Sequence, residues 1–304
     1  MITTKPFIAW HPTFRQPLPE GHRFPMAKYE LLPEQLLYEG VVKEGDFFSP
    51  GIIDTKILSP VHEPAYVHKL INLKLDHKEV RRIGFPLDAR LIERELRIAQ
   101  GTVTGAKTAM KTGLAFNVAG GTHHAGSNWG EGFCMLNDQA VAASYLLEVY
   151  HLKKILIVDL DVHQGNGTAE IFQKEERVFT FSVHGQHNFP FQKEKSDRDI
   201  GLPDDTTGSE YLSVLDKNME DMLTTLHPEF IFFQAGADIL HNDNMGRLKL
   251  TKEDCRQRDK LIFDYCQNFR IPVQVSMGGG YSKKLGDILD VHCNTFKEGI
   301  AAIF

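Results

Sequence analysis

The stretch that decides the fold is residues 155–167, which read Ile-Leu-Ile-Val-Asp-Leu-Asp-Val-His-Gln-Gly-Asn-Gly. Its first four residues are apolar and mostly β-branched, as in a parallel strand that is covered on both faces. The run ends in three side chains spaced two apart, Asp159, Asp161 and His163. Side chains alternate along an extended strand, so these three are predicted to point the same way. They fall at the carboxyl end of the strand, where open α/β sheets bind ligands.

Three other segments repeat this order of buried strand, small residues and reactive side chain. They are residues 230–233 with Asp238, residues 272–277 with Tyr281, and residues 114–119 with His123 and His124. The small residues let the backbone turn tightly after each strand. Four coincident strand ends of this kind favour a metal-hydrolase site.

The residue types indicate a catalytic metal centre. Asp161, His163 and Asp238 offer two carboxylates and an imidazole, which suit a borderline metal such as zinc. Three protein ligands with one open position are typical of catalytic zinc, whereas structural zinc usually takes four ligands, often cysteines. No Cys-x-x-Cys occurs in the chain. Taken alone, Asp-x-His would more often be a strand that ends in a polar turn, so the prediction depends on all four segments together.

Helical patterns alternate with these strands. Apolar residues recur at three- and four-residue steps from Leu96 through Ala99, Val103 and Ala106 to Met110, which predicts an amphipathic helix. Thr251 and Asp254 resemble a capping box at the start of a helix that runs to about residue 269. The alternation predicts a parallel sheet with helices on both faces.

Five motifs together resemble those of the zinc-dependent histone deacetylase family. They are Gly-Gly-Thr-His-His-Ala (120–125), Gly-Phe-Cys-Met-Leu-Asn-Asp (132–138), Asp-Leu-Asp-Val-His-Gln-Gly-Asn-Gly (159–167), Ala-Gly-Ala-Asp (235–238) and Gly-Gly-Gly-Tyr (278–281). Their order and spacing match as well. The His-Gln-Gly-Asn-Gly variant and the opening Gly-His-Arg-Phe-Pro-Met-Ala-Lys-Tyr (21–29) look most like the class IV branch and its bacterial relatives. The resemblance runs from about His11 to the C-terminus and implies the arginase/deacetylase fold, an α/β three-layer sandwich with a mainly parallel sheet. The sequence shows no internal repeat or long linker, so we expect a single domain over residues 1–304.

The resemblance also implies roles for the reactive side chains. His124 corresponds to the general base and acid, and His123 to a charged partner that stabilises the tetrahedral state. Asp159 would pair with His123 and favour its imidazolium form. The hydroxyl of Tyr281 would donate to the developing oxyanion. Considered singly, the histidines could as well be loop residues with backbone partners, and Tyr281 an aromatic packed beside a turn.

Asn166 departs from the class I pattern, in which a second aspartate stands at this position. A neutral amide can orient His124, but it stabilises the charged imidazole less than a carboxylate would. Class II and class IV members share this asparagine, so the resemblance does not imply an inactive enzyme.

An apolar slot is expected for the substrate, because an acylated lysine has a long neutral methylene stem. The resemblance assigns Phe133 and Phe189 to this slot, and Gly132 and Gly279 to the substrate-binding residues. Phe191 is an alternative to Phe189, and core packing is the default for any one of the 20 phenylalanines.

The metal implied by the resemblance is zinc, with iron as the alternative in the cell. The family also often binds a structural monovalent cation such as potassium through backbone carbonyls. Here the corresponding positions lie near Asp159, Asp161, His163, Ser182 and Val183.

Composition limits the partners. The chain has 304 residues, and its net charge of −6 argues against direct nucleic-acid binding, which needs a basic stripe. The short basic stretch 78–82 is interpreted as a solvated patch. Four cysteines without disulfide spacing favour a reducing compartment. The N-terminus does not resemble a signal peptide, and no segment approaches the ~20 apolar residues of a membrane span. We therefore expect a cytoplasmic enzyme with no membrane partner; its oligomeric state is not predicted.

These observations favour a hydrolase that removes acetyl or longer acyl groups from lysine side chains in proteins or peptides. The closest alternative is an acetylpolyamine amidohydrolase, which shares the metal and histidines but accepts a small, cationic acylated amine. The acidic net charge fits that alternative weakly, and no distinctive acidic gate is found. Binuclear manganese ureohydrolases share the fold but need additional paired Asp and His motifs. A non-catalytic acyl-lysine binding protein is disfavoured, because Tyr281 and all three metal ligands are present.

Overall fold

The computed structural model describes residues 5–304 and contains a sheet of eight parallel strands. In spatial order the strands are β2 (Phe47–Phe48), β1 (Ile8–Ala9), β3 (Leu114–Asn117), β8 (Val273–Ser276), β7 (Phe230–Gln234), β4 (Ile155–Asp159), β5 (Val178–Gly185) and β6 (Arg198–Leu202). Each neighbouring pair runs parallel. This arrangement confirms the predicted α/β fold with a parallel sheet.

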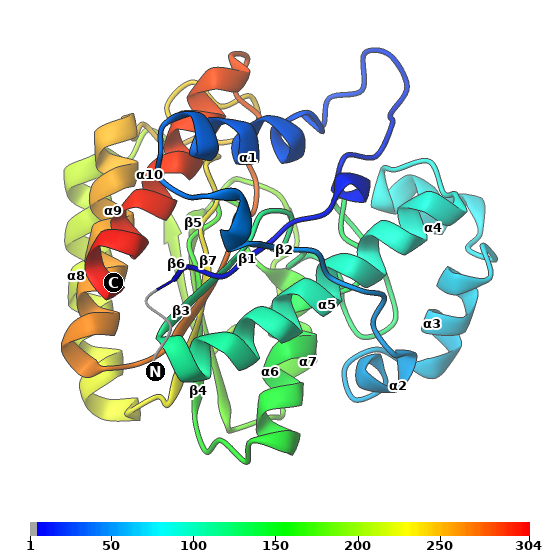
Figure 1. The fold of residues 1–304 in the computed structure, drawn as a ribbon, viewed down its shortest axis with the longest axis horizontal. Coiled ribbons are helices and arrows are strands. Elements are labelled where there is room, and N and C mark those ends of the chain that lie inside the picture. The colour runs from blue at the N-terminus through cyan, green and yellow to red at the C-terminus, as the bar shows by residue number, and fades with distance from the viewer. Residues whose placement is uncertain (1–4) are drawn as a thin grey trace.

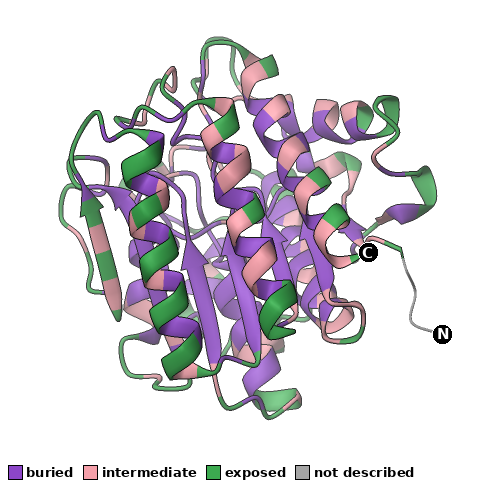
Figure 2. Cartoon of the chain, turned by 90° about the vertical axis from the view of Figure 1, so that its left-hand side faces the viewer, coloured by how far each residue is buried: buried purple, intermediate pink, exposed green. Residues whose placement is uncertain are grey.

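Helices cover both faces of the sheet, which makes three layers (Figure 1). One face carries α8 (Gly208–Leu226), α9 (Lys252–Phe269) and α10 (Leu285–Ile303), and the other carries α5 (Ala89–Thr112), α6 (Asp138–Val149) and α7 (Asn166–Phe172). The remaining helices are α1 (Lys28–Tyr38), α2 (Thr55–Leu58), α3 (Pro64–Ile71) and α4 (His77–Ile83), with 3-10 turns at Pro12–Phe14 and Glu44–Asp46. Figure 2 shows the helices of one face, whose exposed residues lie on their outer sides while the strands behind them are buried.

The central strands form where the sequence places continuous apolar runs. Every residue of β3, β4, β7 and β8 is buried. A strand that helices cover on both faces can be apolar throughout, because neither face is exposed to water. The register aligns Asp159 at the end of β4 with Gln234 of β7 and with Ser182 of β5. The carboxyl ends of these strands therefore meet along one edge of the sheet.

The two helices predicted from the sequence are present. Helix α5 begins after Asp88, whose carboxylate accepts the Leu91 amide at 2.7 Å, and ends at Gly113 in the left-handed conformation. Helix α9 has the predicted capping box, in which Thr251 and Asp254 bond each other's backbone amides. Such caps satisfy amides that have no partner within the helix. Within the described residues 5–304, no helix is long and apolar enough to cross a membrane.

The prediction that Asp159, Asp161 and His163 share one face of an extended strand is wrong. Strand β4 ends at Asp159, and the chain turns directly after it. The Asp161 amide donates to Oδ1 of Asp159 at 3.2 Å, and the His163 amide donates to Oδ1 of Asp161 at 3.0 Å. These local bonds accompany the bend at residues 161–163, which places Asp161 and His163 at the carboxyl edge of the sheet.

Candidate active site

Three buried side chains converge at the carboxyl edge of the sheet. The candidate ligand atoms of Asp161, His163 and Asp238 all lie within 4.8 Å of one another. Nδ1 of His163 lies 3.0 Å from Oδ1 of Asp161 and 3.2 Å from Oδ2 of Asp238. Two carboxylates and one imidazole are a donor set that fits a metal ion with a further position left open.

Backbone amides aim both carboxylates at this point. Oδ2 of Asp161 accepts the Gly279 amide at 2.8 Å, and Oδ1 of Asp238 accepts the Val162 amide at 2.9 Å. The second oxygen of each carboxylate is therefore turned toward His163. A Cβ atom at position 279 would lie 2.0 Å from Oδ2 of Asp238, so only glycine lets the backbone approach so closely.

The charges of this cluster are compatible with a cation bound between the carboxylates. Burial and the neighbouring Asp161 charge raise the pKa of Asp238 to about 7. Burial opposes the charged form of His163, but hydrogen bonds to Asp161 and Asp238 outweigh it and raise the His163 pKa to about 10. A bound metal cation would take the place of the proton that this group otherwise holds between the carboxylates.

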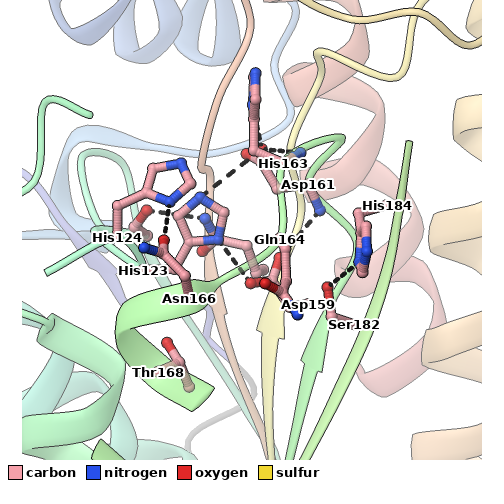
Figure 3. Close-up of polar contacts among 12 residues, drawn as sticks. His123, His124, Asp159, Asp161, His163, Gln164, Asn166, Thr168, Ser182 and His184 are labelled. Atoms are coloured by element: carbon pink, nitrogen blue, oxygen red, sulfur yellow. Dashed lines mark hydrogen bonds and ion pairs between the residues drawn. The ribbon is translucent and has the colours of Figure 1, made fainter. Parts of the chain in front are cut away.

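The two adjacent histidines have different partners (Figure 3). Nδ1 of His123 lies 2.6 Å from Oδ2 of Asp159, and Nδ1 of His124 lies 2.6 Å from Oδ1 of Asn166. Burial lowers the His123 pKa, but the charges of Asp159 and Asp161 outweigh it and raise this pKa to about 9. Burial, followed by the charge of His123, lowers the pKa of His124 well below its ordinary value. Near pH 7, His123 is therefore an imidazolium and His124 is neutral.

Asp138 holds the loop that carries this histidine pair, although the sequence analysis gave it no role. Its Oδ1 accepts the amides of Gly121 and Thr122 at 2.9 and 2.8 Å. Its Oδ2 accepts the hydroxyls of Thr102 and Ser276 at 2.6 and 3.2 Å. The only sequence signal was its place in the motif 132–138, since its partners come from distant segments.

Tyr281 closes the site from the side of β8. Its amide donates to Oδ2 of Asp243 at 2.5 Å, and its ring centroid lies 6.3 Å from that of His163. Burial raises the pKa of Tyr281 well above its ordinary value, so the phenol keeps its proton and remains a donor. Asp243 lies in the loop after β7 and was not predicted.

Two buried cations support the loops behind the Asp161–His163–Asp238 cluster, and neither was predicted. Nζ of Lys28, at the start of α1, donates to the Gly278 carbonyl at 2.8 Å. Burial lowers the Lys28 pKa to about 8. The Arg258 guanidinium of α9 donates to the Gly236 carbonyl at 2.6 Å and is paired with Asp259. Both side chains reach loops that are distant in sequence, so no local pattern could reveal them.

An aromatic cavity of about 560 Å³ leads from the surface to His124, His163 and Tyr281. Gly132, Phe133 and Phe189 line it, whereas Gly279 lies at the carboxylates. The Phe189 ring stands edge-on to His124 with centroids 5.1 Å apart. Phe191 is 86% exposed, so Phe189 rather than Phe191 forms the inner wall.

Gly132 keeps this cavity open next to the histidines. Its φ is +54°, a left-handed conformation that glycine adopts without strain. A Cβ atom there would lie 2.8 Å from Cδ2 of His124 and 3.2 Å from Cε1 of Phe189. A larger residue would therefore displace the general-base candidate or the inner wall.

Known proteins are similar to this chain in sequence and in fold. Residues 22–296 match the family described as histone deacetylase domain. An uncharacterized protein of Picosynechococcus is 42% identical over 285 residues, which cover 94% of this chain and 95% of the relative. Histone deacetylase 2 of Arabidopsis thaliana is 27% identical over 277 residues, 88% of this chain and 72% of the relative. The crystal structure of an HDAC homolog from Aquifex aeolicus has a TM-score of 0.85 at 22% identity and covers 98% of this chain and 84% of that one.

Proposed function

The chain belongs to the histone deacetylase family, and from this we propose that it is a zinc-dependent deacylase acting on lysine side chains in proteins or peptides. Membership makes it a hydrolase of the amidohydrolase type; the lysine substrate and the identity of the metal are our proposal. One observation carries the proposal. The Asp161–His163–Asp238 cluster lies beside the two histidines, with Nε2 of His123 3.8 Å from Oδ1 of Asp161, and both His163 and His124 line the aromatic cavity.

Asp161, His163 and Asp238 would hold the metal, with iron as the alternative to zinc. When bound, the metal supplies Lewis-acid polarisation of the acyl carbonyl and a lower pKa for the attacking water. The protein's own side chains carry out the remaining steps, and burial and neighbouring charges set the protonation states of these side chains.

His124 is the proposed proton carrier. Its Nδ1 bonds the Asn166 amide oxygen, which can only accept, so Nδ1 holds the hydrogen and Nε2 is free. Neutral Nε2 can accept the proton of the attacking water and then deliver it to the leaving lysine amine. The charged His123 beside it, held by Asp159, stabilises the negative charge that develops on the substrate.

Tyr281 is the proposed oxyanion donor. Its protonated hydroxyl can donate to the carbonyl oxygen as that oxygen gains charge, and Asp243 fixes the backbone from which it reaches. Phe133, Phe189 and Gly132 would surround the methylene stem of the lysine. Apolar walls suit that stem because it has no group to hydrogen-bond.

The acyl-lysine substrate can be tested against its alternatives. We expect an acetyl-lysine peptide to be hydrolysed by the metal-loaded protein, and hydrolysis to stop when a chelator removes the metal. Acetylspermidine should be a much poorer substrate. Preference for acetylspermidine would favour the polyamine amidohydrolase, and peptide binding without turnover would favour the binding protein.

A variant at position 124 separates a loss of catalysis from a loss of folding. His124→Ala should retain the metal, because His124 is not a proposed ligand, yet lose turnover. Full activity in this variant would contradict the assignment of the base.

The proposed cytoplasmic location is supported by the four cysteines, which are free and buried as expected in a reducing compartment.

A further inference from the structure

Four arginines surround the outer part of the active-site cavity. They are Arg23, Arg81, Arg82 and Arg247, and the only acidic residue of the lining is Glu131. We name these four residues the arginine rim. The whole chain has a net charge of −6, so the rim concentrates positive charge against the trend of the rest of the molecule.

Three separate segments bring the rim together. Arg23 precedes α1, Arg81 and Arg82 lie in the last turn of α4, and Arg247 lies between β7 and α9. From the sequence alone, the basic stretch 78–82 is predicted to be a solvated patch. The structure shows that two of its arginines, although exposed, also line the cavity.

The rim is fixed to the slot by short backbone and ring contacts. The Gly132 amide donates to the Arg82 carbonyl at 3.2 Å, and the Phe133 amide donates to the Ile83 carbonyl at 2.7 Å. The Arg23 guanidinium lies 5.2 Å from the centroid of the Phe133 ring. A substrate whose acyl-lysine enters between Gly132 and Phe133 must therefore pass beside these charges.

Two of the four charges are compensated by the protein and two are not. Arg82 forms an ion pair with Glu131, and Arg247 lies 3.2 Å from Asp204. Within residues 5–304, neither Arg23 nor Arg81 has a carboxylate oxygen within 4.0 Å. Both side chains are exposed. The rim thus presents two unpaired guanidinium groups to an incoming substrate.

We propose that the arginine rim selects acyl-lysine residues whose flanking residues are aspartate or glutamate. This inference rests on the proposed function, because it names the peptide context that the same site accepts. Guanidinium groups bind carboxylates with paired N–H donors, and a positive cavity mouth raises the local concentration of anionic substrates. It repels cationic ones, which disfavours an acylated polyamine.

The position of the rim favours a peptide over a small acylated amine. An amine that fills the slot leaves the outer cavity unused, whereas a peptide continues across it. Phe191 lies at this outer end, is 86% exposed, and packs edge-on against Phe189 with centroids 6.3 Å apart. An exposed aromatic next to unpaired arginines suits the backbone and acidic side chains of an extended chain.

Three peptides that differ only in the residues flanking one acetyl-lysine test the inference. Their flanks are acidic (Asp and Glu), neutral (Ala and Gly) or basic (Lys and Arg). We expect kcat/KM to fall in that order, by about two- to fivefold for each arginine engaged. The preference should shrink between ionic strengths of about 0.01 M and about 0.15 M, because screening shortens the reach of exposed charges.

A matched pair of variants assigns the preference to the rim. In Arg23→Gln/Arg81→Gln the ratio of kcat/KM for the acidic and neutral peptides should fall to about one. Lys174→Gln/Lys217→Gln removes the same charge from exposed sites in the α7–β5 turn and in α8, and should keep the ratio of the original protein. An equal loss in both variants would mean that net charge alone sets the preference, which overturns the inference.

The remaining outcomes separate the two proposals. Equal hydrolysis of all three peptides, or a preference for the basic one, overturns the rim assignment and leaves the deacylase standing. Hydrolysis of acetylspermidine but of no peptide overturns the proposed function and the rim together. Intact metal content and an unchanged circular dichroism spectrum show that each variant is folded.

Discussion

The imidazole of His124 faces a neutral amide, with its Nδ1 2.6 Å from Oδ1 of Asn166. The adjacent His123 faces the carboxylate of Asp159 at the same distance. Burial and the nearby imidazolium keep the His124 pKa low, whereas the carboxylate raises the His123 pKa to about 9. Two neighbouring histidines are thus held in opposite protonation states, which suits one to carry a proton and the other to carry a charge.

Replacing Asn166 with aspartate tests how the base is tuned. The new carboxylate favours the imidazolium form, so the pKa of His124 should rise. His124 then stays protonated, and unable to act as a base, up to a higher pH. The acidic limb of the kcat/KM profile should therefore move to higher pH. Metal content should not change, because Asn166 is not one of the proposed ligands. An acidic limb at its original pH would show that another group controls this step.

Tyr281→Phe separates oxyanion stabilisation from substrate binding. The change removes one hydroxyl and almost no volume, so the peptide should still bind. We expect kcat to fall by about 10²–10³, the usual effect of one oxyanion donor. Steady-state kinetics on one acetyl-lysine peptide measures this. A variant with unchanged kcat and a higher KM would make Tyr281 a binding residue.

The Arg258–Asp259 pair should contribute to stability as well as to the site. Both side chains are fully buried, and Arg258 also bonds the Gly236 carbonyl of the loop before Asp238. Asp259→Asn leaves a buried guanidinium without its counter-charge, which should cost about 3–5 kcal/mol of unfolding free energy in denaturant titrations. Asp264→Asn breaks an exposed pair with Lys260 in the same helix and should cost less than about 1 kcal/mol. Equal losses in the two variants would refute a special role for the buried pair.

The titration of Lys28 should make the free energy of unfolding depend on pH. Burial lowers its pKa from 10.5 to about 8 in the folded chain. Between these values the unfolded chain binds more protons, so the stability contributed by this group rises with pH over this window. The stability of the metal-free original protein should therefore increase relative to Lys28→Met between about pH 8 and pH 10. Groups that do not interact with Lys28 cancel in this difference. A difference that stays constant with pH would mean that Lys28 titrates as an exposed lysine does.

The sequence predicted the central fold because the buried strands are continuous apolar runs. Strands β3, β4, β7 and β8 and helices α5 and α9 follow from such patterns and from their caps. The two-residue strands β1 and β2 do not, because so short a ladder exists only through its neighbours. The end of β4 at Asp159 was also missed, since composition does not reveal the bend at residues 161–163 or the side-chain bonds that accompany it.

Prediction of the site depended on whether a residue lies near a strand end. The residues of the Asp161–His163–Asp238 cluster and the two histidines follow strands in short motifs, so the sequence alone predicted that they lie close together. Lys28, Asp138 and Asp243 act from other segments, and their contacts exist only in the folded chain. The arginine rim was missed for the same reason, because Arg23 and Arg81 line one cavity only when α4 packs beside the Phe133 loop.

The most direct test of the central claim measures metal content and peptide hydrolysis together in the original protein and in Asp161→Ala. The original protein should bind one metal ion per chain by mass spectrometry and hydrolyse an acetyl-lysine peptide. Asp161→Ala should lose both, with an affinity loss well beyond the 10–100-fold that changes around a metal site typically cause. Asp264→Ala, which removes an exposed carboxylate, should keep both. A folded Asp161→Ala protein with full metal occupancy and undiminished hydrolysis would contradict the proposed metal site.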